Sequence, residues 1–130
     1  MIIKKNSQIS IEFMMMSGLA LITAIIFVSV SLAQAKNLQQ TKELLLLKDI
    51  ALKIQKEVSI ASYTEDGYSR EFGLPEKVVD RNYNISMVNG TLIVWTNASS
   101  YFVRVFNITG QLKKEKNTIT KTSGIVYVNQ

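Results

Sequence analysis

The 130-residue chain contains no cysteine, no histidine and only one proline. Without cysteine it cannot form the disulfides that stabilise many small secreted domains, and zinc sites built from cysteine and histidine are excluded. Any catalysis would have to proceed without a histidine base or a cysteine nucleophile. The sequence also lacks a Gly-rich phosphate loop, a paired-carboxylate site and a nucleic-acid-binding module. We therefore expect no enzyme activity, no catalytic residue, no metal and no cofactor.

The charge balance favours basic residues, with 15 lysines and arginines against 10 acidic residues and a net charge of +5. Such a balance suggests an acidic partner, either nucleic acid or an anionic membrane surface. Lys4 and Lys5, however, precede a long apolar run, where positive charge marks the cytoplasmic side of a membrane helix. Without these two lysines the chain has 13 basic and 10 acidic residues, a net charge of +3. We therefore expect a membrane partner and no nucleic-acid partner.

Residues 13–35 contain no charged side chain. As a helix, these residues would extend about 35 Å, which exceeds the roughly 30 Å of hydrocarbon in a bilayer. Gly18, Ala20 and Ala24 leave notches at which a second helix could approach closely. The run predicts a membrane-spanning helix that either anchors the protein or packs against other helices.

A cleaved secretory signal peptide is an alternative interpretation of the same segment. Lys4 and Lys5 would form its basic region, and Ala33-Gln34-Ala35 resembles a cleavage site. Against this interpretation, the apolar run is longer than the usual stretch of about 7–15 residues. Glu12 also places a negative charge between the lysines and the apolar run.

Glu12 is the acidic residue that directly precedes the apolar run. An unpaired acid inside a bilayer helix costs about 2.5–3.5 kcal/mol on insertion scales, and less near the membrane surface. Glu12 is therefore either a simple interfacial carboxylate or a group that needs a positive partner once the helix enters a protein interior. In the second case the pair would set the register between neighbouring subunits.

The segment around Glu12 resembles the class III signal peptide of archaeal type IV pilins. The motif is a Gln followed by a Ser and a Glu at two-residue intervals, and here it is Gln8, Ser10 and Glu12. The resemblance implies that a prepilin peptidase cuts between Ser7 and Gln8, so that residues 1–7 are a cleavable leader. It also implies that Glu12 pairs with the N-terminal amine of a neighbouring subunit. This sequence departs from the family at Asn6-Ser7, where the family usually has a glycine before the cut.

The resemblance implies a structural subunit of an archaeal type IV pilus-like filament, used for adhesion. Its partners would be copies of itself in a helical filament, the prepilin peptidase and the pilus assembly machinery. The precursor would lie in the cell membrane and the mature protein in an extracellular filament. Subunits of archaeal motility filaments have a related leader but usually lack the Gln-x-Ser-x-Glu pattern. The alternative is a single-pass membrane-anchored extracellular protein whose head binds a partner.

The apolar run and the preceding motif are expected to form a helix over residues 8–35. Beyond it, we expect the helix to continue as an amphipathic segment over residues 36–66. Apolar side chains recur there at alternating spacings of three and four, which is one face of a helix. They are Leu44, Leu47, Ala51, Ile54, Val58 and Ala61. Charged residues, Glu57 among them, lie between these positions. This face is expected to pack under a globular head, and Gly67 is a stop signal for the helix.

The C-terminal region, residues 67–130, is predicted to form a small antiparallel β head. Beyond Pro75, short runs rich in β-branched and aromatic residues predict strands, and Asn89-Gly90 is typical of a type I′ hairpin turn. The predicted strands are residues 83–88, 91–96, 101–106, 119–122 and 125–128, with an exposed loop at residues 111–116. The fold class is thus α+β and type IV pilin-like, with a long N-terminal helix packed on a small sheet.

Four Asn-x-Ser/Thr sequons fall within this head, at Asn84, Asn89, Asn97 and Asn107. Each is a candidate glycosylation site if the head is exported. The alternative is that asparagine, serine and threonine are simply common in turns and on solvated strands.

Overall fold

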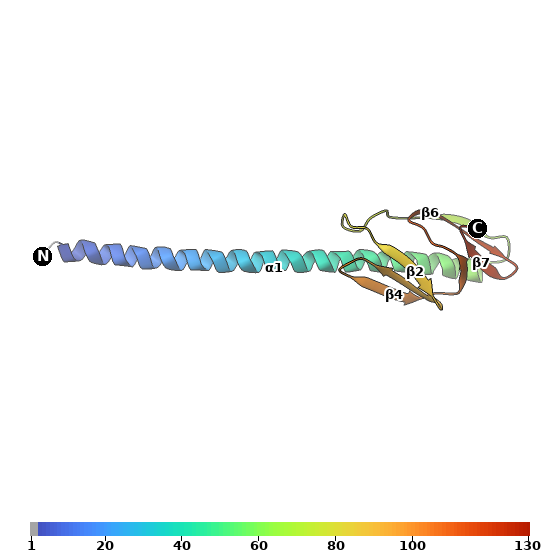
Figure 1. The fold of residues 1–130 in the computed structure, drawn as a ribbon, viewed down its shortest axis with the longest axis horizontal. Coiled ribbons are helices and arrows are strands. Elements are labelled where there is room, and N and C mark those ends of the chain that lie inside the picture. The colour runs from blue at the N-terminus through green and yellow to red at the C-terminus, as the bar shows by residue number, and fades with distance from the viewer. Residues whose placement is uncertain (1–2) are drawn as a thin grey trace. The chain divides into compact units, whose positions relative to one another are not determined.

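The computed structural model describes residues 3–130, and side chains from Gln8 onward. One helix, α1 (Ile3–Tyr63), precedes seven strands, β1 to β7 (Figure 1). The expected α+β fold, with a long N-terminal helix and a β-rich C-terminal head, is confirmed. The chain divides into two compact units, of which the first ends at Leu38 and the second begins at Gln39. The second half of α1 therefore belongs to the same unit as all the strands.

In the first unit, three hydroxyl groups within the apolar run are satisfied by the helix itself. Thr23 donates to the carbonyl of Leu19 at 2.8 Å, Ser29 to that of Ile25 at 2.8 Å, and Ser31 to that of Phe27 at 2.9 Å. Such bonds to the carbonyl four residues earlier satisfy a hydroxyl without water. These three side chains are therefore compatible with a dry environment.

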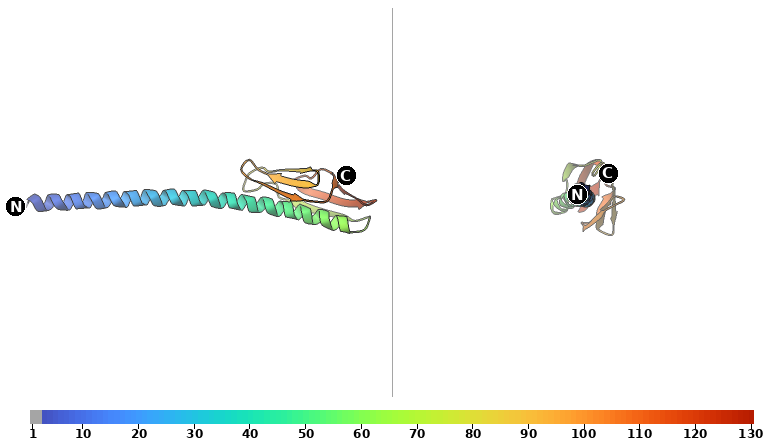
Figure 2. Two further views of the ribbon diagram at one scale, coloured as in Figure 1. Left: turned by 90° about the horizontal axis from the view of Figure 1, so that it is seen from below. Right: turned by 90° about the vertical axis from the view of Figure 1, so that its left-hand side faces the viewer.

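In the second unit, one face of α1 is buried by the strands (Figure 2). Of the predicted apolar positions, five are buried: Leu47, Ala51, Ile54, Val58 and Ala61. The prediction that Leu44 belongs to the buried face is wrong. Its side chain is 43% exposed, whereas Glu43 is only 3% exposed. The reason is the placement of the head: Thr96 and Arg81 contact Glu43, whereas position 44 is turned from position 43 by about 100° around the helix.

A three-stranded antiparallel sheet contains β2 (Asn84–Val88), β3 (Thr91–Trp95) and β4 (Ser100–Arg104). The predicted hairpin is confirmed, with φ values of 50° at Asn89 and 75° at Gly90 in the β2–β3 turn. The register pairs Ile85 with Val94, so these side chains share the inward face of the sheet. The opposite face carries every second residue, including Phe102, which is 70% exposed.

A second sheet has four strands in the order β1-β6-β7-β5. The strands are β1 (Ser69–Leu74), β6 (Glu115–Thr122), β7 (Ile125–Val128) and β5 (Ile108–Gly110). Its β1–β6 and β6–β7 pairs are antiparallel, but β5 runs parallel to β7. The expectation of a wholly antiparallel head is therefore wrong for this sheet, which is mixed.

Two strands and part of a third were not predicted from the sequence. β1 has the sequence SREFGL, which is mostly polar and contains a glycine, so its residues do not by themselves favour a strand. It is a strand because it pairs with β6. β5 is only three residues long. Residues 115 and 116 were expected in an exposed loop but begin β6, where Lys116 pairs with Gly73 of β1.

The core of the second unit lies where the two sheets meet the buried face of α1. Each sheet contributes alternate residues to it, as half-buried strands do. The buried apolar strand residues are Phe72, Leu74, Leu92, Val94, Ile119, Val126 and Val128. This arrangement fixes the end of α1 against the head.

The C-terminal end of α1 is capped by the β6–β7 hairpin. The Nζ of Lys121 donates to the carbonyls of Ser62 and Thr64, both at 2.8 Å. The carbonyls at a helix C-terminus lack intrahelical partners and carry partial negative charge, so a lysine there is stabilising. The Asp66 carboxylate accepts from the amide of Gly124 in the hairpin turn at 2.9 Å. The helix therefore ends where a distant hairpin meets it.

Tyr83 is the largest fully buried side chain of the core, and its hydroxyl donates to the carbonyl of Pro75. Burial disfavours the phenolate and raises the pKa of Tyr83 from 10.0 to about 12. The folded state therefore holds this proton more tightly than the unfolded state. The contribution of Tyr83 to stability is fully present below pH 10 and is lost as the pH rises through the folded pKa.

We therefore expect the free energy of unfolding to fall by about 1–2 kcal/mol between pH 10 and pH 12 because of Tyr83 alone. The Tyr83→Phe variant should lose this part of the pH dependence while keeping the part that comes from lysine deprotonation. Denaturant titrations of both proteins at several pH values would measure the difference. Parallel pH profiles for the two proteins would contradict the assignment.

Candidate functional site

The apolar part of α1 is uncovered along its length within the first unit. The helix is long and apolar enough to cross a membrane, and its most apolar stretch has no buried residue. Large side chains such as Phe13, Met16 and Phe27 are each more than 70% exposed. Apolar surface of this extent is not stable in water, so it must be covered by lipid or by other protein. The helix is therefore the part of the chain that needs a partner.

Glu12 lies at one end of this surface, in a shallow apolar groove. The groove is lined by Glu12, Met15, Met16, Gly18, Leu19 and Ile22. A Cβ built on Gly18 would meet nothing within 4 Å, so the notch expected there is open space. A second helix approaching along this groove would meet apolar side chains, a small residue that permits close contact and one carboxylate.

The structure places the residues of the processing motif in the first turns of α1. Gln8, Ser10 and Glu12 are all exposed. Gln8 and Glu12 are four residues apart and share a helix face, whereas Ser10 lies on another side of the helix. The side chain of Ser7, like those of the whole leader of residues 1–7, lies outside the described side chains.

Glu12 takes part in none of the ion pairs found among the described side chains. Those three pairs are all in the second unit. The carboxylate of Glu12 thus presents its charge at the edge of an apolar surface. It could accept hydrogen bonds from an ammonium group supplied by another molecule.

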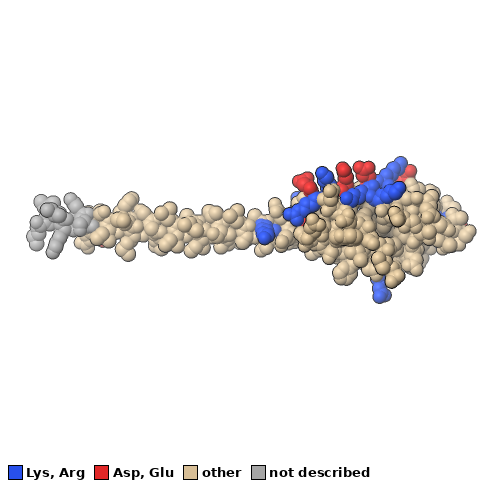
Figure 3. Space-filling model, in the orientation of Figure 1, with Lys and Arg blue, Asp and Glu red and all other residues tan. Residues whose placement is uncertain are grey.

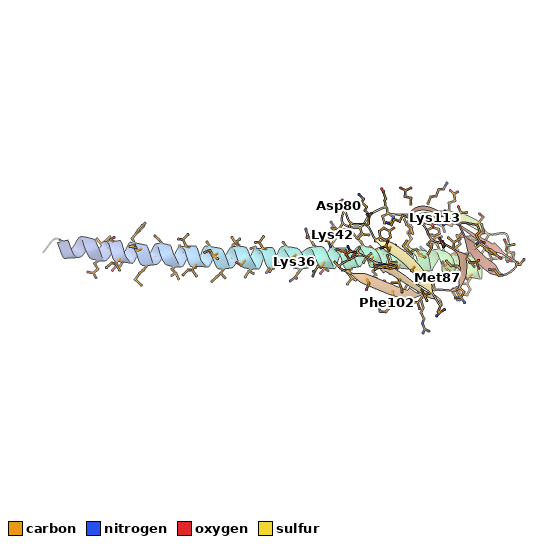
Figure 4. All side chains as sticks on the ribbon, viewed as in Figure 1. Lys36, Lys42, Asp80, Met87, Phe102 and Lys113 are labelled. Carbon is orange, nitrogen blue, oxygen red and sulfur yellow. The ribbon has the colours of Figure 1, made fainter. Side chains whose placement is uncertain are left out.

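Charged side chains are unevenly spread over the strands of the head. Between residues 82 and 112 the only charged side chain is Arg104. Figure 3 shows acidic and basic side chains gathered along the upper edge of the head, with one basic side chain below. Figure 4 places Asp80 and Lys113 on the upper side and Phe102 on the opposite side. The charge-poor stretch is visible in the sequence, whereas the row of charged side chains along one edge of this face is visible only in the structure.

All four sequon asparagines lie in this charge-poor segment, and each is exposed. Asn84 is on the outer face of β2, opposite Trp95 of β3. Asn89 is in the β2–β3 turn, Asn97 follows β3, and Asn107 directly precedes β5. The fold brings two of the sequons together, because a Cβ on Gly90 would lie 3.3 Å from the Oδ1 of Asn107.

Two glutamates of α1 are buried in the second unit, which the sequence analysis missed. Glu43 accepts from the hydroxyl of Thr96, and its other carboxylate oxygen lies 3.5 Å from Arg81. Glu57 was expected between the apolar positions, yet it is only 6% exposed and lies 3.5 Å from Arg70. A buried carboxylate is costly unless it is paired, so these contacts hold the head on the helix.

No group of three or more acidic side chains is placed to hold a metal ion anywhere in the part of the chain that the structure describes. Comparison of the chain with protein-family models, with curated proteins and with solved structures found no match.

Proposed function

We propose that this protein is a structural subunit of an archaeal type IV pilus-like surface filament. In this proposal a prepilin peptidase removes residues 1–7, and the protein assembles through its N-terminal helix into a homo-oligomeric filament that serves adhesion. The observation that carries the proposal is the uncovered apolar surface of α1, which has one carboxylate, Glu12, beside an open notch at Gly18. The motif Gln8-Ile9-Ser10-Ile11-Glu12 supports it independently.

The energetics of assembly follow from this surface. Apolar side chains gain little when they exchange lipid for other apolar side chains, so close packing and polar pairing must supply the specificity. Removal of the leader would create an amine at Gln8, and that amine is a suitable partner for the Glu12 carboxylate of another subunit. In a dry helical bundle such a pair fixes the register between subunits, because leaving either charge unpaired is expensive.

The proposal also accounts for the two units of the chain. The first unit would lie in the membrane before assembly and in the filament interior afterwards. The second unit, with its own core and caps, would remain outside the cell and form the filament surface. A plain membrane anchor is the second candidate, because lipid alone could also cover the same helix.

N-terminal sequencing of the protein isolated from its native cells tests the proposal. We expect the mature chain to start at Gln8. A Ser7→Gly variant should be processed in the same way, whereas Ser7→Phe should block cleavage because the peptidase accepts a small residue before the cut. A start at Met1 would support the anchored alternative, and a start at Lys36 would support ordinary secretion.

A further inference from the structure

An uncharged pocket opens on the second unit beside the end of α1. Its lining includes Ser62, Tyr63, Phe106, Asn107, Thr109 and Ile125, and its volume is about 530 Å³. The Tyr63 ring stands edge-on to the Phe106 ring, with 5.4 Å between centroids and an interplanar angle of 86°. Tyr63 is nevertheless 81% exposed and Phe106 46% exposed. Two adjacent exposed aromatic rings with hydroxyl and amide groups beside them form a surface suited to a sugar ring.

The same pocket contains a complete glycosylation sequon. Asn107 and Thr109 are two residues apart where the chain enters β5, so their side chains project to the same side. Both are exposed, and both line the pocket. The acceptor amide and the threonine hydroxyl of Asn107-Ile108-Thr109 therefore stand together beside the two aromatic rings.

The other three sequons have different surroundings. In Asn89-Gly90-Thr91, the first two residues have positive φ values in a tight turn. In Asn97-Ala98-Ser99, the amides of Ala98 and Ser99 are tied to the Thr96 hydroxyl at 3.2 and 3.1 Å. Asn84 projects from the outer face of β2. Asn107 is thus the sequon asparagine that lies in an aromatic pocket.

We infer that Asn107 carries an N-linked glycan whose first, uncharged sugar lies in this pocket against Tyr63 and Phe106. The inference rests on the proposed function only in requiring that the head lies outside the cell. In the reaction, Asn107 Nδ2 forms a bond to the anomeric carbon of a sugar carried on a lipid phosphate. The bond from that carbon to the phosphate oxygen breaks, the lipid phosphate leaves, and the amide gives up one proton to a base of the transferase.

The attached sugar would contact both the aromatic and the polar groups of the pocket. Its C–H face would pack on the aromatic rings, and its hydroxyls would reach the Thr109 side chain and the Ser62 oxygen. The Ser62 hydroxyl already donates to the carbonyl of Val58 at 2.8 Å, so its oxygen remains available as an acceptor. The glycan would also cover exposed apolar surface that otherwise favours non-specific association.

Mass spectrometry of the full chain from native cells tests the modification. Trypsin releases residues 105–113, which contain no other sequon, so any added sugar mass on this peptide reports on Asn107. We expect the wild-type peptide to carry a neutral glycan mass, the Thr109→Ser variant to keep it and the Thr109→Ala variant to lose it. An unmodified peptide in the wild-type protein would overturn the inference. The N-terminus of the same sample is sequenced separately, so a start at Met1 would count against the filament and not against the glycan.

Thermal unfolding tests whether the sugar packs in the pocket. Loss of the glycan through Thr109→Ala should lower the Tm by about 2–4 °C. In a Tyr63→Ser background, the same loss should change the Tm by less than about 1 °C, because the sugar no longer has its ring to pack against. An equal drop in both backgrounds would show that the sugar does not lie in the pocket.

Discussion

Replacing Glu12 with alanine is expected to leave membrane insertion intact and to abolish filaments. Insertion depends on the apolar run that follows Glu12, which the substitution does not touch. Assembly, as proposed, brings a positive N-terminal amine into the dry bundle, where it would then lack a partner. Removing one member of a buried ion pair costs about 3–5 kcal/mol, and every 1.4 kcal/mol is about a tenfold change in an equilibrium constant. We therefore expect at least about 100-fold fewer filaments, counted by electron microscopy of native cells.

Two further variants separate charge from shape at this position. Glu12→Gln keeps the size and the hydrogen-bonding capacity of the side chain but removes its charge, and it should fail as Glu12→Ala does. Glu76→Ala removes an exposed carboxylate in the head and should leave filaments at the wild-type level. The protein should be present in the membrane fraction in every case. Normal filaments from Glu12→Ala would show that the carboxylate has no role in assembly.

Replacing Gly110 with alanine should cause the largest loss of stability in the head. Gly110 has a φ of +115°, a conformation that side chains rarely adopt. A Cβ at this position would lie 2.0 Å from the carbonyl oxygen of Val128, the residue with which Gly110 pairs in β7. The clash is with backbone, so the parallel β5–β7 pair must separate. We expect the free energy of unfolding to fall by about 3 kcal/mol or more.

Gly124→Ala is the matched control for this substitution. Gly124 also has a positive φ, of +77°, but a Cβ there would meet nothing within 4 Å. This substitution should lower the free energy of unfolding by about 1–2 kcal/mol, because alanine disfavours the left-handed conformation. Urea titrations of the full chain, followed through its single tryptophan Trp95, would measure both. Equal losses for the two variants would mean that the contact with Val128 is not the cause.

Those elements whose signals are local could be predicted from the sequence. The alternating three- and four-residue spacing identified the buried face of the helix from Leu47 to Ala61. Asn89-Gly90 identified the β2–β3 hairpin turn, because the turn requires positive φ values that these residues tolerate. A uniformly apolar run is likewise visible without any tertiary information.

The elements that were missed depend on residues far apart in the chain. β1 is polar and becomes a strand only through its register with β6. The parallel pairing of β5 with β7 has no signature in three residues. Glu57 has the sequence context of a solvated residue, and only the approach of Arg70 from β1 makes its burial tolerable. Propensity and periodicity describe neighbours along the chain and carry no information on such partners.

The sequence by itself determined that this protein has a long apolar helix, a Glu12 at its beginning and a β-rich head. It did so because hydropathy, helical periodicity and turn chemistry are properties of short segments. Only the tertiary structure decided which face of the helix the head covers, and that Asn107 lies beside Tyr63 and Phe106. These features arise when strands from residues 69–128 pack on one helix, since burial and proximity depend on the whole fold.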